Sequence, residues 1–293
     1  MPELPEVETV RRGLQPVLEQ KRIKRLEQRR PNLRFPFPEN FSLRVEDQTI
    51  TSLGRRAKYL LADLTSGDVL VMHLGMSGSF RIEVPEGMDV PGAFHHERSK
   101  ISAHDHVVIH MEDGTTITYN DPRRFGFMLL IPRAEIAEHK LFLKMGIEPF
   151  GNSLTPAYLA ERFKGRTTNL KAALLDQSNV VGLGNIYVAE ALWRAGLSPK
   201  RSAGSLVTKA GRPTKHLEPL IEIIQAVLSE AIEAGGSSLR DHAQTDGSLG
   251  YFQHRFSVYD RETVECQRDG CEGVIEKFTQ NGRSTYWCPS CQR

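Results

Sequence analysis

Four cysteines near the carboxyl end constrain the fold of this chain more than any other feature of its sequence. Cys266 and Cys271 have four residues between them, Cys288 and Cys291 have two, and sixteen residues separate the pairs. Two close pairs around a hairpin-sized spacer are typical of a tetrahedral zinc ribbon. The sequence therefore predicts one structural Zn²⁺ bound by Cys266, Cys271, Cys288 and Cys291, with free or disulfide-linked thiols as the alternative.

Such an ion would stabilise a short terminal element that lacks a core of its own. The cysteines lie within the last 28 residues, and the rest of the chain has none. Because the protein supplies all four ligands, the metal keeps no open position for a substrate. Arg283, Ser284 and Thr285 fall in the hairpin between the pairs, where side chains that bind phosphate would be placed.

Short apolar runs separated by turn-forming residues dominate the first half of the chain. Turn formers such as Glu112-Asp113-Gly114 separate them. Several short strands joined by tight turns predict an antiparallel β-sandwich between about residues 23 and 131. The runs most typical of strands are residues 49–53, 59–64, 69–74, 107–111 and 116–119.

The character of the sequence changes at residue 146. Residues 146–152 contain two glycines and a proline, and we interpret them as a linker. Beyond it, apolar residues recur at helical spacing, and Gly235-Gly236-Ser237-Ser238 ends the last helix. The predicted helices are residues 156–163, 170–175, 186–195 and 217–234. The chain is thus predicted to be an α+β multidomain protein.

Composition and charge exclude some classes of protein. No apolar run approaches the roughly 20 residues of a membrane span, and the charged start lacks the apolar core of a secretion signal. We therefore expect a cytoplasmic protein. The net charge of +2 does not by itself indicate nucleic-acid binding. Between residues 11 and 34, nine Lys and Arg stand against two Glu, which fits either a phosphate-facing surface or a solvated helix and strand.

The first residues suggest a reaction centre. If Met1 is removed, Pro2 presents a free secondary amine followed at once by the carboxylate of Glu3. An α-amino group titrates near pH ~8, so a useful fraction is an unprotonated nucleophile that can form an imine. The alternative is an ordinary helix start, since proline and acids such as Glu6 are favoured there. Lys58 lies at a strand start among basic neighbours that favour a neutral, reactive amine, although a solvated lysine is the default.

Three further motifs place, in turns, side chains that could contact phosphate or insert between bases. In residues 182–187, two glycines precede an Asn185 that would cap a helix and expose N–H groups to an anion. In residues 120–127, Arg123 and Phe125 suit phosphate contact and insertion between bases. Met76, in a turn flanked by glycines, is a second candidate wedge. The alternatives are a tight turn between helices, a charged hairpin with its ring in the core, and core filling by the methionine.

These motifs occur together in the order found in one enzyme family. The chain closely resembles bacterial formamidopyrimidine-DNA glycosylase, a bifunctional enzyme that removes oxidised purines from DNA, over nearly its whole length. The motifs that carry the resemblance are Pro2-Glu3-Leu4-Pro5-Glu6-Val7-Glu8-Thr9, Arg55-Arg56-Ala57-Lys58-Tyr59-Leu60, His73-Leu74-Gly75-Met76-Ser77-Gly78, His104-Asp105-His106, Asn120-Asp121-Pro122-Arg123-Arg124-Phe125-Gly126, Gly182-Leu183-Gly184-Asn185-Ile186-Tyr187 and the four cysteines.

The resemblance implies an N-terminal helix on an antiparallel β-sandwich, a helix–two-turn–helix domain and a C-terminal zinc ribbon, with DNA in the cleft between the halves. We place the N-terminal catalytic β-sandwich domain at residues 1–145 and the helix–two-turn–helix DNA-binding domain at residues 153–235. A lesion-capping loop would occupy residues 236–256, and the four-cysteine ribbon residues 257–293.

The resemblance also implies catalytic roles. Pro2 would be the Schiff-base nucleophile, Glu3 the acid/base at the sugar, and Glu6 a supporting acid in the same pocket. Lys58 would assist β-elimination and contact phosphate. Arg283 would grip phosphate and take part in δ-elimination. No catalytic cofactor is implied beside the structural zinc.

The remaining implied roles concern DNA. Asn185 would hold phosphates around the lesion. His104 and Arg123 would touch the DNA backbone, while Met76, Arg123 and Phe125 would fill the space left by the flipped nucleotide. The implied partner is double-stranded DNA that contains an oxidised base, bound by a monomer without a membrane.

The departures from the family pattern lie outside this chemistry. The first cysteine pair has four intervening residues where many members have two, and Asp260 stands where members often have glycine. Near Thr167, where some members have a lysine that contacts DNA, the nearest basic residue is Arg166.

Two other functions remain as alternatives. An endonuclease VIII-type glycosylase has the same fold and amine but acts on oxidised pyrimidines. Leu4, the three gap-filling residues and the long loop after Gly235 favour the purine enzyme. A non-catalytic zinc-ribbon DNA-binding protein would use the first residues only as a helix start, and would bind DNA in a salt-sensitive way without cutting it.

Overall fold

The computed structural model describes residues 2–85, 101–237 and 250–293. The chain forms two compact units. The first contains Met1–Leu143 and Ile232–Gln253, and the second contains Lys144–Ala231 and His254–Arg293. The chain therefore leaves the first unit after Leu143, returns to it at Ile232 and leaves it again after Gln253. None of the described helices combines the length and apolar character needed to cross a membrane.

The first unit is built mainly from strands. Its elements are α1 (Leu4–Leu18), β1 (Lys21–Gln28), α2 (Phe41–Val45), β2 (Thr49–Arg56), β3 (Tyr59–Leu64), β4 (Asp68–His73), β5 (Ser79–Glu83), the 3₁₀ turn η1 (Ser102–His104), β6 (Asp105–Met111), β7 (Thr116–Asn120), β8 (Phe127–Pro132) and the 3₁₀ turn η2 (Arg133–Glu135).

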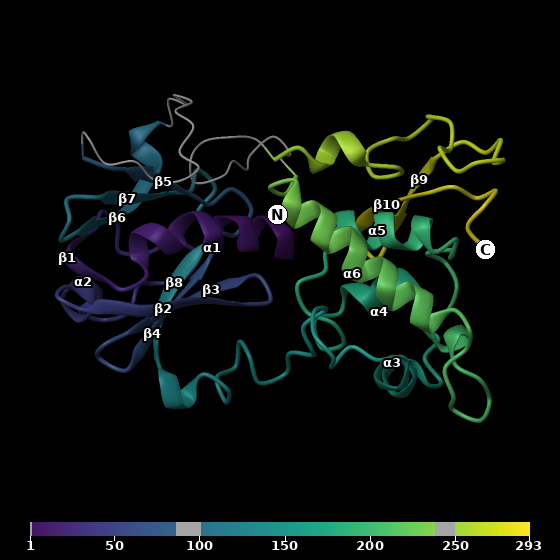
Figure 1. Ribbon diagram of the computed structural model, residues 1–293, viewed down its shortest axis with the longest axis horizontal. Helices are drawn as coiled ribbons and strands as arrows, with labels where there is room; N and C mark the ends of the chain where they lie inside the picture. The colour runs from purple at the N-terminus through teal and green to yellow at the C-terminus, as the bar shows by residue number, and fades with distance from the viewer. Residues whose placement is uncertain (1, 86–100, 238–249) are drawn as a thin grey trace. The chain divides into compact units, whose positions relative to one another are not determined.

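The strands pair antiparallel in the order β5-β7-β6-β1-β2-β3-β4-β8. β1 pairs with β2 only through Lys21 and Arg22, and with β6 through residues 23–28. The sheet therefore divides at β1 into two halves. Figure 1 shows β5, β6 and β7 on one side of the unit and β2, β3 and β4 on the other, with α1 between them.

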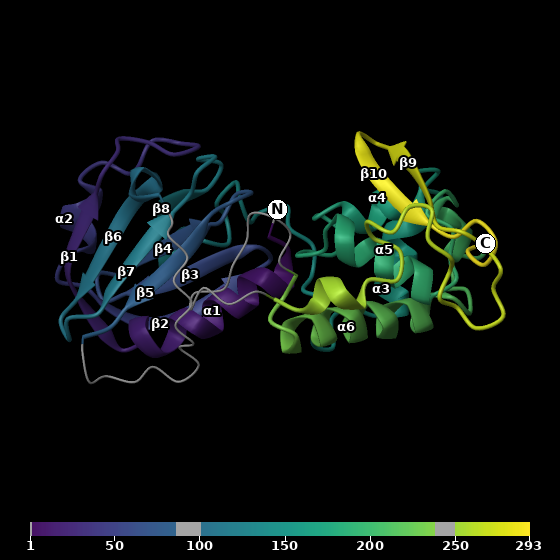
Figure 2. The ribbon, with the colours of Figure 1, turned by 90° about the horizontal axis from the view of Figure 1, so that it is seen from above.

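One hydrophobic core joins α1 to both halves of the sheet. The helix buries residues 7, 10, 14, 17 and 18, which recur at the three- and four-residue spacing of one helical face. Leu60 from β3 and Phe80 from β5 belong to the same core. Figure 2 shows α1 lying along the strands. The predicted antiparallel β-sandwich with an N-terminal helix is confirmed.

The remaining elements are α3 (Pro156–Phe163), α4 (Leu170–Leu175), α5 (Asn185–Arg194), the 3₁₀ turn η3 (Ala203–Leu206), α6 (Leu217–Glu233), the 3₁₀ turn η4 (Phe252–Arg255), β9 (Glu276–Gln280) and β10 (Arg283–Trp287). The four predicted helices are confirmed to within one residue at each end.

A buried glutamate ties the β9–β10 hairpin region to α5. Glu190 is 0% exposed and accepts hydrogen bonds from the backbone N–H groups of residues 257, 258 and 259 at 2.9, 3.0 and 2.9 Å. Burial raises the pKa of this carboxyl group, against the opposing effect of the three donors. Ala189, Ile275 and Tyr286 share a small core beside it. The helix and the ribbon therefore form one packed body.

Ion pairs neutralise much of the basic cluster between residues 11 and 34. Arg11 and Arg12 both contact Glu8 at 2.9 Å, and other members pair with acids of the same unit. Because these charges are balanced locally, the solvated helix and strand is the better interpretation of this cluster.

Candidate active site, DNA contacts and metal site

The first described residues, which lead into α1, are buried. Pro2 is buried, and Glu3 and Glu6 are 3% and 2% exposed. Glu3 is the N-cap of α1, and its backbone N–H donates to Oε2 of Glu6 at 2.8 Å in a capping box. A helix start explains the capping box, but not the burial of two carboxyl groups. The structure thus brings together the three N-terminal residues that the sequence singles out.

The second oxygen of Glu6 binds a residue from far along the chain. Oε1 accepts the backbone N–H of Ser237 at 2.8 Å and its hydroxyl at 2.9 Å. Gly236 lies so close that an added Cβ would stand 3.2 Å from Oε1 of Glu6. The Glu6 carboxylate therefore bridges the backbone of Glu3 and the backbone of Ser237.

The structure describes the two ends of the predicted capping loop. Residues 238–249 of that loop lie outside the described residues. Ser237 and Tyr251 form an antiparallel β-bridge, and Phe252 donates its N–H to the carbonyl of Gly236 at 3.1 Å. A Cβ at Gly250 would lie 2.2 Å from the same carbonyl oxygen, so only glycine allows this close approach.

Lys58 occupies the turn between β2 and β3. It is 7% exposed, so it is not the solvated lysine that is the default for this residue type. The preceding residue, Ala57, has φ 53°, and its carbonyl accepts a 2.7 Å hydrogen bond from Arg55. Backbone and side-chain contacts thus fix the turn that presents the lysine.

His73, at the end of β4, is a half-buried neutral imidazole. Its ring stacks on Phe127 with a centroid distance of 5.1 Å, and Nδ1 accepts the N–H of Gly75 at 3.0 Å. Burial, with the nearby positive charges of Lys58 and Arg34, lowers its pKa to about 4. Its neutral form organises the turn that follows, which carries Met76.

Acid should destabilise the first unit through His73. The unfolded chain binds a proton at this residue below its ordinary pKa of 6.5, whereas the folded chain does so only near 4. The free energy of unfolding therefore contains the full contribution of neutral His73 above pH 6.5. That contribution falls as the pH drops from 6.5 to 4, by up to about 3 kcal/mol. Urea unfolding of wild type and His73→Gln at several pH values measures it.

As the pH drops from 6.5 to 4, the free energy of unfolding should fall more steeply for wild type than for His73→Gln. Carboxylates that titrate at lower pH are common to both proteins and cancel. Parallel stability curves would contradict the role given to the imidazole.

The three candidate gap-filling residues lie on two turns. Met76 is half-buried in the turn between β4 and β5, outside the hydrophobic core. Phe125 is 45% exposed, so the alternative in which this ring folds into the core is wrong. The guanidinium of Arg123 lies 5.1 Å from the Phe125 ring centroid. His104 is half-buried on η1, and its carbonyl accepts the N–H of Asp121 at 3.0 Å.

Asn185 and Arg283 are brought together in the second unit. The side-chain amide of Asn185 donates to the carbonyl of Ser284 at 2.9 Å, directly beside the exposed Arg283 at the start of β10. Asn185 is the first residue of α5, and Gly184 is the N-cap, so the prediction that Asn185 caps the helix is wrong. The reason is that the side chain of Asn185 points to the ribbon, where its amide donates to the carbonyl of Ser284.

Lys171 is a buried residue that sequence reasoning missed. It is 2% exposed, and its Nζ donates to the carbonyl of Ser284 at 2.8 Å and to Oγ1 of Thr285 at 2.7 Å. The available signal was its position three residues before Leu174 on the buried face of α4. A pocket of 230 Å³ opens beside it, with Asp176 and Arg283 in its lining.

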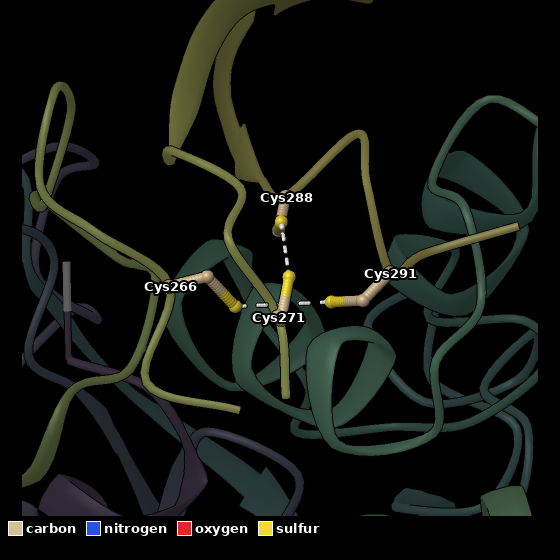
Figure 3. A group of neighbouring side chains, drawn as sticks. All are labelled: Cys266, Cys271, Cys288 and Cys291. Atoms are coloured by element: carbon tan, nitrogen blue, oxygen red, sulfur yellow. Dashed lines mark hydrogen bonds between the residues drawn. The ribbon is translucent and has the colours of Figure 1, made fainter. Parts of the chain in front are cut away.

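The four cysteines meet as predicted. All four are free, and their sulfur atoms lie within 4.8 Å of one another. The sulfurs of Cys266 and Cys291 are 3.8 Å apart, and those of Cys271 and Cys288 are 3.6 Å apart. Figure 3 shows the thiols converging on a common centre. Tetrahedral coordination at about 2.3 Å places sulfurs about 3.8 Å apart, so the cluster fits one metal ion and not disulfides.

Comparisons with known proteins agree with this geometry. The family model for the formamidopyrimidine-DNA glycosylase N-terminal domain matches residues 1–128, and that for the H2TH domain of the same enzyme matches residues 145–243. A Bradyrhizobium protein named formamidopyrimidine-DNA glycosylase is 62% identical over 293 residues, with complete coverage of both chains. A Rhizobium johnstonii protein of the same name is 60% identical over 296 residues, again with complete coverage.

Solved structures show the same fold. The Thermus thermophilus MutM (Fpg) protein is 36% identical, with a TM-score of 0.81, over 99% of this chain and 98% of that one. A Lactococcus lactis Fpg mutant in complex with DNA containing Fapy-dG is 33% identical, with a TM-score of 0.84, over 100% of both chains. The chain therefore belongs to the formamidopyrimidine-DNA glycosylase family.

Proposed function

We propose that this protein excises oxidised purines, including 8-oxoguanine and formamidopyrimidines, from double-stranded DNA and then cleaves the strand by β,δ-elimination. The observation that carries the proposal is the buried N-terminal group of Pro2, Glu3 and Glu6. The Lactococcus lactis relative was crystallised with DNA containing Fapy-dG, which supports the substrate class.

The reaction begins with extrusion of the damaged nucleotide. A base inside a duplex hides its anomeric carbon, and flipping it out costs a few kcal/mol of stacking and pairing. Lys58, Asn185 and Arg283 grip the phosphates, while Met76, Arg123 and Phe125 occupy the vacated space. His104 and Arg123 contact the DNA backbone. These contacts supply the free energy that holds the flipped state.

The chemical steps use the terminal amine. The Pro2 nitrogen attacks the anomeric carbon, and the bond to the oxidised purine breaks with its electron pair leaving on the base. Glu3 protonates the ring oxygen, so the sugar opens to an iminium. The iminium acidifies the adjacent C–H, and Lys58 assists loss of that proton as the 3′ phosphate departs. A second elimination, aided by Arg283, releases the 5′ phosphate.

The metal has a structural role in this proposal. Cys266, Cys271, Cys288 and Cys291 hold one Zn²⁺, and four thiolate ligands leave no position for substrate. The residues of the chain carry the chemistry, and no catalytic cofactor takes part. We place the protein in the cytoplasm with the bacterial DNA, acting as a monomer.

Substrate choice distinguishes the purine enzyme from its nearest rival. Duplexes with 8-oxoguanine opposite each base in turn, and duplexes with an oxidised pyrimidine, are incubated with the protein. The purine lesion should be cut at least about tenfold faster, a difference of ~1.4 kcal/mol in the transition state. Faster cutting of the pyrimidine lesion would favour an endonuclease VIII-type enzyme, and binding without cutting would favour a non-catalytic DNA-binding protein.

A further inference from the structure

A single buried side chain joins the two turns that carry the candidate gap-filling residues. Asp121, directly after β7, is 0% exposed. Its Oδ1 accepts the hydroxyl of Ser77, from the Met76 turn, at 2.6 Å. Its Oδ2 accepts the N–H of Gly126, directly after Phe125, at 2.8 Å. One carboxylate therefore holds both turns from within.

Ser77 also forms a hydrogen bond to the turn that carries Arg123. While its hydroxyl donates to Asp121, its oxygen accepts the backbone N–H of Arg123 at 3.2 Å. The residue is 4% exposed, so water does not compete for these bonds. A short hydrogen-bonded chain thus runs from the backbone of Arg123 through Ser77 to Asp121.

The two turns also touch directly through glycine. A Cβ at Gly75 would lie 2.3 Å from the carbonyl carbon of Phe125 and 2.3 Å from the nitrogen of Gly126. Gly75 also has φ 63°, in the left-handed region. The backbone just before Met76 therefore packs directly against the peptide bond that follows Phe125, with no side chain between them.

The rest of the surroundings fix Asp121 in place. Tyr119 donates its hydroxyl to Oδ2 at 3.3 Å, and burial together with the carboxylate raises the pKa of Tyr119 well above 10.0, which keeps it a donor. The backbone N–H of Asp121 donates to the carbonyl of His104, and Nε2 of His106 donates to the carbonyl of Asp121 at 2.9 Å. The candidate backbone contact His104 is thus tied to the same residue.

We infer that Asp121 and Ser77 are positioning residues that lock the two turns together, so that Met76, Arg123 and Phe125 enter the DNA as one preformed wedge. The inference rests on the proposed function, because it assumes that these three side chains fill the gap left by a flipped nucleotide. Neither Asp121 nor Ser77 touches the reacting atoms in this account. Their effect is confined to steps that require extrusion of a base from a duplex.

Ser77→Ala tests the inference, because it removes the hydroxyl that links the turns and adds no bulk. Excision of 8-oxoguanine from a duplex should fall about tenfold, the size expected for loss of a hydrogen bond to a charged group. Cleavage of a preformed abasic site in single-stranded DNA needs no gap filling, so it should change by less than about twofold. A fluorescent 2-aminopurine next to the lesion should show slower unstacking.

Thr115→Ala is a matched control. Thr115 is also a buried hydroxyl residue, 2% exposed, but it lies in the β6–β7 turn outside this network. It should leave both activities unchanged. Asp121→Asn keeps the shape of the side chain but leaves a single acceptor oxygen, so the Ser77 hydroxyl and the Gly126 N–H can no longer both be accepted on separate oxygens. It should give the same split between duplex and single-stranded substrates. Thermal unfolding of each variant establishes that it is folded.

The outcomes are distinct. Equal losses on duplex and single-stranded substrates would reduce Ser77 and Asp121 to a general structural role and overturn the inference. Wild-type rates of duplex excision and unstacking in both variants would do the same. Wild-type protein that binds lesion duplexes without excising the base would instead overturn the proposed function, and this inference with it.

Discussion

Protein that retains a peptide extension before Pro2 should form no borohydride-trapped adduct with DNA containing 8-oxoguanine, whereas protein that begins at Pro2 should form one. An extension converts the secondary amine into an amide, which has no basic lone pair for attack on the sugar. Excision and strand cleavage should fall by at least about a thousandfold, as when an essential catalytic group is removed. Gel shift of the adduct and mass spectrometry of its N-terminal peptide provide the measurement.

The same extension placed after Arg293 is the matched control, since it leaves the amine free. Both proteins should still bind DNA with a non-cleavable abasic analogue, because the phosphate contacts are intact. An adduct mapped to another residue, such as Lys58, would show that the nucleophile had been assigned incorrectly. Loss of folding in the extended protein is tested by its thermal unfolding.

Removal of the metal should abolish tight DNA binding while the β-sandwich stays folded. Cys288 is 0% exposed and lies in a small core with Ile275 and Tyr286, so Cys288→Ser or chelation should unfold the hairpin. The bonds that place Arg283 and Ser284 beside Asn185 would then be lost. Loss of two hydrogen bonds to the charged phosphates, from Asn185 and Arg283, weakens binding by about a hundredfold.

Equilibrium binding to lesion duplex, with metal content determined on the same sample, measures this effect. Ser290→Ala is the control, because Ser290 is exposed between two of the cysteines and is not a predicted ligand. Far-ultraviolet and near-ultraviolet circular dichroism report whether the sandwich survives. Unchanged binding after verified metal loss would remove the ribbon from the DNA interface.

Local signals explain why the helices were predictable. Thr155 and Asn169 precede α3 and α4, and their side chains accept the N–H groups of Tyr158 and Ala172 at 3.1 and 2.8 Å. Such caps can be identified in the sequence because donor and acceptor are three residues apart. β1, by contrast, was not singled out, because only residues 23 and 26 of this strand are fully buried and its alternation is weak.

The candidate site was predictable where its residues are neighbours in the sequence. Pro2 and Glu3 are consecutive, and the cysteine pairs are closely spaced. The bond from Ser237 to Glu6 spans 231 residues, and that from Ser77 to Asp121 spans 44. No sequence period or cap links such positions, since only tertiary folding brings them together. Sequence patterns therefore indicated the candidate reactive groups but not the polar contacts made by residues far apart in the chain.

The long span between Glu6 and Ser237 has a consequence for synthesis of the protein on the ribosome. The glutamate is translated early, but its hydrogen-bonding partner follows 231 residues later, which takes about 10–50 s at bacterial elongation rates. A nascent chain released before that point lacks the hydrogen bonds between Ser237 and the Glu6 carboxylate. Prematurely terminated products should therefore fail to cut DNA that contains an oxidised base, even when they begin at Pro2.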